Sequence, residues 1–522
     1  MAFTIAITSS LPHVQFQFMD LLHFLLAALS LYALGWIMYC RFLHPFADVP
    51  GPFLASFSRL WIGASVAGGR AEHTQRELHK KHGALVRIAP NEVAVADPSA
   101  CKIIYNIKSG FSKTDFYPPF APKISSHGDH FTQLDEVKHA EPRKYVNSVY
   151  SMSTILESEQ YIDACSDVFV EKMGKFAETG VNIDLGEWIQ WQVLHICATS
   201  ILIPISKLTE LYLRYTFDVI GELFFGQQFG FMRDEHDYGR YIESLDTLLP
   251  GIALSCVLPS YVRSFHSILG LLFPTIRKSI SGFDEIRAAG RYWTNVRQKQ
   301  MQTGTTGRVD LLDKFFKIRE VKGGFDIPEI QNEACVAIFA GSDTTAIALR
   351  SILYHLMKSK TCMEKLVAEI DDFDSRGLLG KQHIRYAEAM KMPYLVACCK
   401  EGGATIAGRY FPAGSRVSMN AAVIQYDPLV FGDDAATFNP DRWIDGDGAL
   451  MDRHMLHFGG GSRTCIGKNI SLAEMHKLIP QLLRSVSVHL VDPSREWKTE
   501  NFWFNKQTGI HARVVARTGR GT

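Results

Sequence analysis

A single cysteine in a glycine-rich run constrains this 522-residue chain more than any other feature. Residues 458–467 read FGGGSRTCIG, with Cys465 near the end of the run, and a helix-like stretch follows from Lys468. Free N–H groups and the helix dipole at such a helix start favour the thiolate form of a cysteine. A thiolate can bind haem iron and donate electron density to it. We therefore predict that Cys465 is the axial ligand of a haem.

The neighbours of Cys465 suit the same cofactor. Gly461 and Gly467 have no side chain, which lets the backbone approach a flat macrocycle closely. The planar guanidinium of Arg463 matches a haem propionate carboxylate. The ring of Phe458 is placed to pack on the sulfur side and to keep water away.

Two other interpretations of this run explain less of it. One is a glycine-rich loop around a buried free cysteine. The other is a phosphate-binding loop, which Gly467 and Lys468 resemble in part. Ser462 stands where such a loop has its first glycine and Asn469 where it has Ser or Thr, so the second interpretation fails.

The run matches the pattern Phe-x-x-Gly-x-Arg-x-Cys-x-Gly, which resembles the haem-binding signature of the cytochrome P450 family at every fixed position. The resemblance covers nearly the whole chain. It implies a mainly α-helical fold with small β-sheets, a single haem domain and an N-terminal transmembrane helix. The cofactor would be haem b, with Cys465 as the iron ligand.

A long helical pattern over residues 329–356 carries a second motif. Residues 340–345 read AGSDTT, which resembles the oxygen-activation motif of the same family. Asp343 and Thr344 place an acid and an alcohol in an apolar stretch, as a proton relay to dioxygen requires. The alternative is a core helix whose Ser and Thr hydroxyls bond back to the preceding turn.

His139 and Arg143 are four residues apart and share one face if their segment is helical. The resemblance implies that these basic residues meet the haem propionates, and an ordinary solvated face is the alternative. Pro142 complicates a helix here, because proline is expected only near a helix start.

The N-terminal region predicts a membrane anchor. Residues 21–40 contain no Lys, Arg, Asp or Glu, and their length spans a bilayer. Residues 1–20 carry no Lys or Arg while Arg41 follows the span, so the positive-inside rule places residues 1–20 in the lumen and the remainder in the cytosol. A cleaved signal peptide would have a basic start and a shorter apolar core. Residues 41–60 resemble the proline-rich hinge of microsomal members, which implies the endoplasmic reticulum membrane, and residues 61–522 form the haem domain.

Two places depart from the family pattern. Arg442 lies in a segment whose arginine normally closes a buried triad with a Glu-x-x-Arg pair, but Glu401 is followed by Gly402, Gly403 and Ala404. This indicates a deletion after residue 401, and removing one partner of a buried ion network costs about 3–5 kcal/mol.

Residues 192–214 show no helical or strand period and are an anomalous insertion. Two splice-site errors would explain both, and a degenerate enzyme is the alternative.

Other segments predict the remaining architecture. Residues 84–88 and 92–96 read as two strands around a turn, and residues 97–100 as a helix start. Residues 110–133 are rich in Gly, Pro, Ser and aromatic residues and predict a long loop, which in the family lies over the haem. Residues 216–226 read as an amphipathic helix and resemble fungal members related to pisatin demethylase. After the gap, residues 402–417 look like a β-hairpin.

Composition excludes several classes of function. Lys plus Arg number 55 and Asp plus Glu 54, so nothing indicates nucleic acid as a partner. The 10 cysteines are scattered, which is typical of free thiols in a reducing compartment.

The sequence therefore predicts a membrane-anchored haem-thiolate monooxygenase that oxidises an apolar small molecule, with secondary metabolism implied by the fungal resemblance. No Gly-x-Gly-x-x-Gly fingerprint is evident, so electrons would come from NADPH–cytochrome P450 reductase. The alternatives are a haem-thiolate isomerase or dehydratase that needs no reductase, and a catalytically dead or wrongly spliced member without the Glu-x-x-Arg helix.

Overall fold

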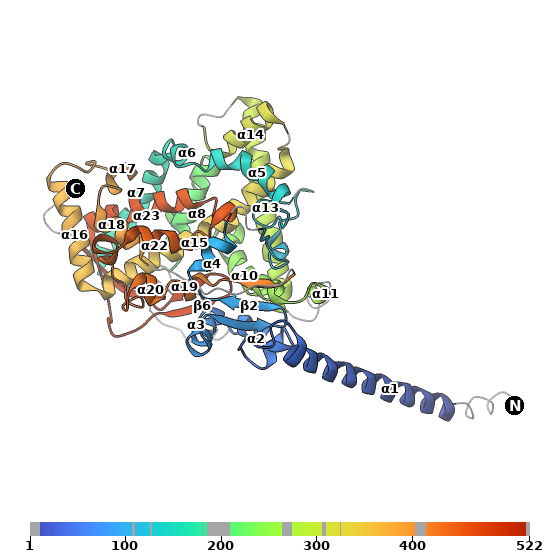
Figure 1. Ribbon diagram of the computed structural model, residues 1–522. Helices are drawn as coiled ribbons and strands as arrows, with labels where there is room; N and C mark the ends of the chain where they lie inside the picture. Colours follow the sequence, from blue (N-terminus) through green and yellow to red (C-terminus); the bar gives the residue numbers. More distant parts are fainter. Residues whose placement is uncertain are drawn as a thin grey trace, which may run out of the picture.

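Helix α15 (Ile327–Lys358) is the longest element and runs through the middle of the protein (Figure 1). The computed structural model describes residues 11–106, 110–125, 128–180, 182–184, 209–263, 274–304, 309–323, 325–401 and 414–517. Asp326 and Glu329 form a capping box at the start of α15, which satisfies free N–H groups of its first turn. Most of its side chains are buried, as expected for a central core helix. The predicted helix over residues 329–356 is confirmed.

The other helices surround α15, and α8, α13, α16 and α23 pack directly against it. The longer ones are α1 (Leu11–Met38), α2 (Leu60–Ala67), α3 (Ala71–His82), α4 (Ser99–Ile104), α5 (Glu136–Val149), α6 (Met152–Leu156), α7 (Glu159–Thr179), α8 (Thr209–Phe225), α10 (Tyr241–Val257), α13 (Pro274–Thr303), α14 (Leu311–Lys322), α16 (Lys360–Ser375), α18 (Pro393–Lys400), α22 (Gly448–His454) and α23 (Lys468–Ser485). Single-turn helices include α9 (Phe231–Asp234), α11 (Ser260–Arg263), α17 (Tyr386–Ala389), α19 (Ala421–Ile424), α20 (Pro428–Phe431) and α21 (Arg442–Asp445). In the loop of residues 110–133, the described part forms only the short turn η3 (Pro118–Phe120).

The described strands form three small sheets. In the first, β1 (Leu85–Ala89) pairs antiparallel with β2 (Glu92–Val95), and β4 (Arg416–Ser418) pairs parallel with β2. The second has the order β3 (Asn182–Asp184), β8 (His511–Ala516), β5 (Val486–Leu490), and the third is the hairpin of β6 (Lys498–Asn501) and β7 (Asn505–Thr508). The predicted mainly helical fold with small sheets is confirmed, as are the two strands near residues 84–96.

Helix α5 continues through Pro142, so the expectation that proline marks a helix start was wrong here. The side chain of Asp135 caps the N-terminus by accepting from the N–H groups of Val137 and Lys138. Pro142 has no N–H to donate to the carbonyl of Lys138. Helix α5 therefore tolerates the loss of this one hydrogen bond at an exposed residue, Lys138.

The anomalous segment 192–214 lies largely outside the described residues. Its last part belongs to α8, which begins at Thr209 rather than near residue 216. Leu213 and Arg214 are buried within that helix. Helix α8 therefore starts earlier than the amphipathic pattern predicted. An amphipathic pattern marks a helix with one exposed face, and Leu213 and Arg214, which are neighbours in sequence, are both buried.

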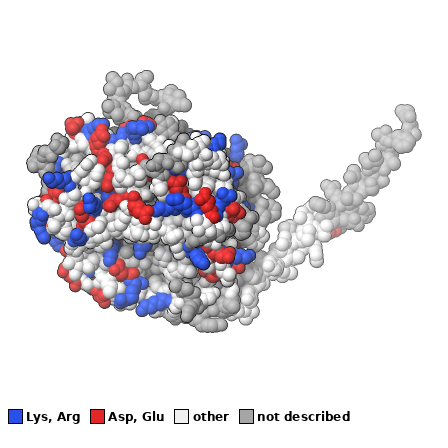
Figure 2. All heavy atoms as spheres, turned by 90° about the horizontal axis from the view of Figure 1, so that it is seen from above, with Lys and Arg blue, Asp and Glu red and all other residues white. Residues whose placement is uncertain are grey.

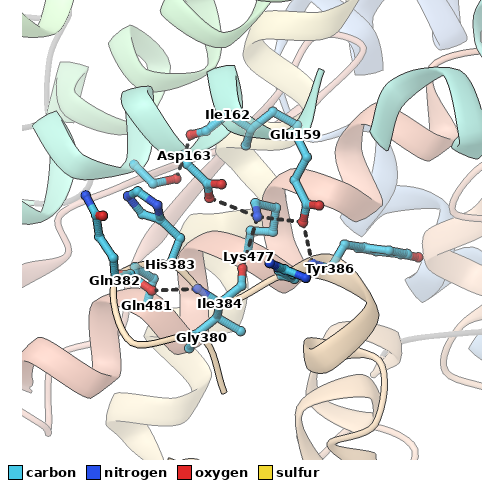
Figure 3. A network of polar contacts seen from close by, with 12 residues as sticks. Glu159, Ile162, Asp163, Gly380, Gln382, His383, Ile384, Tyr386, Lys477 and Gln481 are labelled. Carbon is cyan, nitrogen blue, oxygen red and sulfur yellow. Dashed lines mark hydrogen bonds and ion pairs between the residues drawn. The ribbon is translucent and has the colours of Figure 1, made fainter. Parts of the chain in front are cut away.

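A buried lysine fixes helix α23, whose first turn follows Cys465. Lys477 is 1% exposed, and its amine donates to Glu159 at 2.7 Å, to Asp163 at 2.8 Å and to the carbonyl of Ile384 at 3.0 Å (Figure 3). Gln481, one turn further along α23, accepts from the N–H of Ile384. Lys477 thereby joins α23 directly to α7, and Lys477 and Gln481 together join α23 to the loop of residues 380–386.

The N-terminal helix α1 projects away from the body of the protein (Figure 1). Residues Met19–Leu43 are long and apolar enough to cross a membrane, with mean hydropathy 1.9, and their most apolar stretch is 0% buried. Helix α15 passes the same test but is largely buried, so it is a core helix. The apolar helix that was predicted for residues 21–40 is therefore present and suited to membrane anchoring.

The segment after α1 is held by one buried arginine. Arg87, on β1, is 2% exposed. Its Nη1 donates to the carbonyls of Cys40 at 2.7 Å and Phe46 at 3.2 Å, and its Nη2 to Pro90 at 2.7 Å. The guanidinium thus binds carbonyls at the C-terminal end of the anchor helix, where cations are favoured. These hydrogen bonds hold the start of the proline-rich segment, at Cys40 and Phe46, against the first sheet.

Charged side chains of both signs are interspersed over the face seen in Figure 2, and the described part of the projecting helix is nearly free of them. This mixture of signs on the visible face agrees with the net charge of +1.

Candidate active site

The loop that carries Cys465 ends at the first turn of α23. The N–H of Cys465 donates to the carbonyl of Phe458 at 2.7 Å, which closes the loop. Burial raises the pKa of the Cys465 thiol, whereas the N–H groups of Gly467 and Lys468 and the charge of Arg143 oppose that rise. The predicted helix-start environment of the sulfur is therefore present.

Cys465 differs from the other described cysteines in its exposure. Cys465 is exposed and Cys399 is half-buried, whereas the remaining described cysteines are buried. A thiol that is enclosed by protein atoms cannot bind a metal, because no metal can reach its sulfur. Among the described cysteines, Cys465 is therefore the most accessible to a haem iron.

The glycines of this loop serve protein packing as well. Gly461 has φ +61°, and a Cβ there would collide with the carbonyl oxygen of Tyr105. A Cβ at Gly460 would meet the Tyr105 side chain at 3.0 Å. Gly467 lies beside the sulfur, where a Cβ would be 3.9 Å from Sγ of Cys465. The sequence predicted that Gly461 lets the backbone approach a macrocycle. In the structure, the group that lies close to the backbone at Gly461 is Tyr105.

Four basic side chains gather beside the loop. Burial lowers the pKa of His139 to about 3, with Arg463 and Arg143 as the next causes. Burial likewise lowers the pKa of Lys113 to about 7, and Arg463 again contributes. Lys113, His139 and Arg143 therefore lie near enough to Arg463 for its positive charge to disfavour their protonated forms.

One carboxylate of the chain already meets this cluster. Glu136 accepts from Nε of Arg463 at 2.9 Å and from Nη2 at 2.6 Å. Arg143 donates to the carbonyl of Thr464 and so reaches the Cys465 loop. In contrast, the buried atoms Nη1 of Arg463 and Nε2 of His139 have no hydrogen-bond partner in the described structure.

These residues fit haem. A buried guanidinium nitrogen of Arg463 and a buried ring nitrogen of His139, both without a hydrogen-bond partner in the described structure, suit the propionate carboxylates. Cys465 provides a thiolate ligand at a helix start. His139, Arg143, Arg463 and Cys465 are brought together by α5 and the loop before α23, as the resemblance implied.

Helix α15 presents one partly open face in its middle. Ala340, Gly341 and Thr344 are half-buried, whereas Ser342, Asp343 and Thr345 are buried. The hydroxyl of Thr344 donates to the carbonyl of Ala340 at 2.8 Å, which is the back-bonded arrangement named above as the alternative. A Cβ at Gly341 would meet the Ile220 side chain of α8 at 2.7 Å, so this glycine allows close helix packing.

Asp343 faces away from Thr344 and into the protein. It is 1% exposed, and its Oδ1 lies 3.9 Å from Nη2 of Arg350, two turns along α15. Neither carboxylate oxygen has a hydrogen-bond partner in the described structure. The acid and the alcohol are therefore adjacent in sequence but have different surroundings.

Glu401 and Arg442 are paired as the resemblance implied. Nε of Arg442 donates to Oε1 of Glu401 at 2.8 Å, and both side chains are nearly buried. The N–H of Asn439 and the indole of Trp443 also donate to Glu401, at 2.9 and 2.7 Å. Asp434 accepts from Arg442 at 2.7 Å. Asn439 and Trp443 thus give Glu401 further donors beside Arg442. The absence of the third, arginine member of the triad stays a prediction, because residues 402–413, which follow Glu401, lie outside the described residues.

A cavity of about 440 Å³ lies behind the Cys465 loop. Phe458, Cys399 and His476 contribute to its wall, and neither Cys465 nor any residue of α15 does. It is therefore not the space between α15 and the sulfur in which a haem would lie. Its wall includes the end of α18, next to residues outside the described structure.

The sequence interpretation missed three residues of this site. Lys113 joins the basic cluster, Glu136 holds Arg463, and Tyr105 supports Gly460 and Gly461. Glu136 was the easiest to find, because it precedes His139 by one helical turn. Lys113 and Tyr105 come from loop segments that no periodicity places near residue 463.

A mainly helical fold in which a helix-start cysteine faces a basic cluster defines a haem-thiolate protein. The family model of cytochrome P450 matches residues 203–402 and 403–511. Its two matched segments meet at the position where the Glu-x-x-Arg arginine is missing.

Curated relatives agree over most of the chain. Cytochrome P450 monooxygenase gsfF of Penicillium aethiopicum is 38% identical over 516 residues, covering 94% of this chain and 98% of the relative. Cytochrome P450 monooxygenase ACRTS1 of Alternaria alternata is 34% identical, covering 72% and 99%. Pisatin demethylase of Fusarium vanettenii is 30% identical, covering 91% and 90%. This chain belongs to the cytochrome P450 family and is an oxidoreductase of the monooxygenase class.

Proposed function

We propose that this enzyme inserts one oxygen atom from dioxygen into an apolar small molecule in fungal secondary metabolism, with electrons from NADPH–cytochrome P450 reductase. The observation that carries the proposal is the exposed Cys465 at the start of α23, next to a basic cluster with unpartnered buried donors. The named activities of the fungal relatives support it. When bound, haem supplies the iron centre that activates dioxygen.

The residues of the chain have distinct roles in this proposal. Arg463, Arg143 and His139 would hold the propionates of a haem, and the Cys465 thiolate would bind its iron. Phe458 and Gly467 pack around the sulfur and limit water. Thr344, on the open face of α15, passes protons to the oxygen substrate, and Asp343 supplies the charge that draws protons to that hydroxyl. Thr344 must then exchange its bond to Ala340 for one to water.

The test is a reduced carbonyl spectrum of the purified chain, followed by product formation with NADPH and reductase. A red-shifted Soret band and reductase-dependent turnover are expected. Turnover without reductase would indicate a haem-thiolate isomerase or dehydratase instead. A chain that gives no such band would be catalytically dead.

Removing the hydroxyl of Thr344 should affect proton delivery and leave haem binding intact. We expect Thr344→Ala to contain normal haem but to release roughly ten times more hydrogen peroxide per NADPH, a modest share of the effect that a positioned proton donor has. Thr345→Ala, on the buried side of α15, is the matched control. Unchanged coupling in an active Thr344→Ala enzyme would count against the relay.

We propose that α1 anchors the enzyme in the endoplasmic reticulum membrane, with residues 1–20 lumenal and the haem domain cytosolic. Deleting residues 1–42 should weaken membrane association in cell fractionation without removing it. The exposed apolar side chains of Phe53, Leu54 and Leu60 remain near the first sheet and retain contact with lipid. Glycosylation of a sequon introduced after residue 60 would show the opposite topology.

We also propose that the insertion at 192–214 and the deletion after 401 are errors in the assignment of introns in the gene. The transcript across codons 190–216 and 398–404 tests this directly. A chain without residues 192–214 and with a restored Glu-x-x-Arg helix should hold more haem per protein than the present sequence. Equal haem content would show that Asn439 and Trp443 replace the missing arginine adequately.

A further inference from the structure

Glu136 is an acidic side chain in direct contact with the loop that carries Cys465. Its Oε1 accepts from both Nε and Nη2 of Arg463, at 2.9 and 2.6 Å. Its Oε2 accepts from Oγ of Ser462 at 3.4 Å and lies 4.0 Å from Nδ1 of His139. Arg463 is expected to bind a propionate, yet a carboxylate of the chain already occupies part of its guanidinium.

The carboxylate of Glu136 occupies one edge of the Arg463 guanidinium and leaves another nitrogen free. Nε and Nη2 bond to Glu136, whereas Nη1 is buried and has no hydrogen-bond partner in the described structure. The Glu136 side chain is 37% exposed and that of Arg463 12%, so the acid lies on the solvent side of the guanidinium. The guanidinium is planar and rigid, so fixing one edge also fixes the direction of the remaining nitrogen.

The face of helix α5 that bears Glu136 holds the Cys465 loop at two successive residues. Glu136, His139 and Arg143 are spaced by three and four residues, which places them on one face of α5. Arg143 donates to the carbonyl of Thr464, next to the residue that Glu136 holds. Both contacts therefore act on the segment just before the predicted iron ligand.

We propose that Glu136 is a positioning residue for Arg463, which keeps Nη1 directed to a haem propionate, and that its negative charge lowers the reduction potential of the haem iron. An anion near the site stabilises ferric iron relative to ferrous iron, which carries one positive charge less. The inference rests on the proposed function, in which Arg463 holds a propionate. Glu136 acts through Arg463 and through its charge, without touching the reacting atoms.

The first experiment measures the rate at which the full-length, haem-loaded enzyme loses haem to an excess of apomyoglobin. Glu136→Ala removes the carboxylate and leaves the cap of α5, Asp135, in place. We expect haem loss to accelerate about tenfold, as when a hydrogen bond to a charged group is removed. A slower loss would show that Glu136 competes with the propionate for Arg463. Either a slower or an unchanged rate would overturn the inference.

A second background separates the positioning of Arg463 from support of α5 as a helix. Arg463→Met leaves no guanidinium for Glu136 to hold. Adding Glu136→Ala to this variant should therefore give no further acceleration of haem loss beyond about twofold. A further tenfold acceleration would show that Glu136 stabilises α5 independently of Arg463, and the inference would fail.

The reduction potential tests the charge while the geometry is kept. Glu136→Gln retains an Oε1 that can accept both bonds from Arg463 and removes the negative charge. We expect its potential to rise by about 30 mV, a roughly threefold change in a one-electron equilibrium at 59 mV per tenfold. An unchanged potential would contradict the proposed effect of the charge.

Glu141→Gln is the matched control, because it changes the net charge of the protein equally. Glu141 is exposed and lies five residues along α5, about 140° around the helix from Glu136. Its potential and its rate of haem loss should equal those of the parent, and an equal shift of potential in both variants would overturn the inference. Neither measurement requires turnover. Absence of reductase-dependent product would therefore refute the proposed function alone, and these two measurements would still decide the role of Glu136.

Discussion

Replacing Cys465 with histidine should abolish the red-shifted Soret band of the reduced carbonyl complex. That band requires a thiolate bound to the iron, and imidazole does not produce it. The variant is expected to lose monooxygenase turnover completely, since the Cys465 thiolate would supply the electron density that the haem needs to activate dioxygen. The measurement is the carbonyl difference spectrum of purified protein at known haem content.

Cys399→Ala is the matched control, because Cys399 is the half-buried cysteine among those described. Its spectrum should equal that of the parent. If Cys465→His retains the band, another cysteine is the iron ligand and the assignment of the site is wrong.

Replacing Arg442 with methionine should destabilise the protein by about 3–5 kcal/mol, the usual cost of removing one partner from a buried ion pair. Arg442 donates to Glu401, to Asp434 and to the carbonyl of Thr437. Without it, Glu401 retains only Asn439 and Trp443 as described donors and remains buried with its charge. The measurement is the urea midpoint of haem release and of helix loss.

Lys365→Met removes the more exposed pair with Asp441 and serves as the control. Exposed pairs are worth about 0–1 kcal/mol, so its midpoint should hardly move. A small effect of Arg442→Met would show that Asn439 and Trp443 satisfy Glu401 by themselves. Loss of haem binding with an unchanged urea midpoint would show that Arg442 acts on the Cys465 loop rather than on stability.

Short-range patterns predicted much of this fold. The helical pattern over residues 329–356 predicted α15, and the two strand-like runs around the turn near residue 90 predicted β1 and β2. Both patterns are local, because the hydrogen bonds of a helix or a hairpin join residues close in sequence. Pro142 shows the limit of local rules, since α5 continues through a residue that usually interrupts a helix.

The site was predictable where one segment carries several of its residues. The loop of residues 458–467 placed Cys465, Arg463 and Gly467 together, and the spacing of His139 and Arg143 placed both on one face of α5. Lys113, the Trp443 donor to Glu401 and the Glu136–Arg463 pair depend on contacts between segments far apart in sequence. Such contacts follow from packing of the whole chain, and no local pattern in the sequence marks them.

The buried guanidinium of Arg87 has a consequence for movement at the membrane. A ten-residue flexible linker would let an attached domain sample distances of about 15–20 Å. The bonds from Arg87 to the carbonyls of Cys40 and Phe46 remove that freedom, so α1 is a rigid connection to the haem domain and not a flexible one. With α1 in a bilayer, the haem domain would keep a constant tilt angle to the membrane and a constant height above the lipid surface. Encounters with other membrane proteins would then occur by lateral diffusion, with the same side of the enzyme always facing the bilayer.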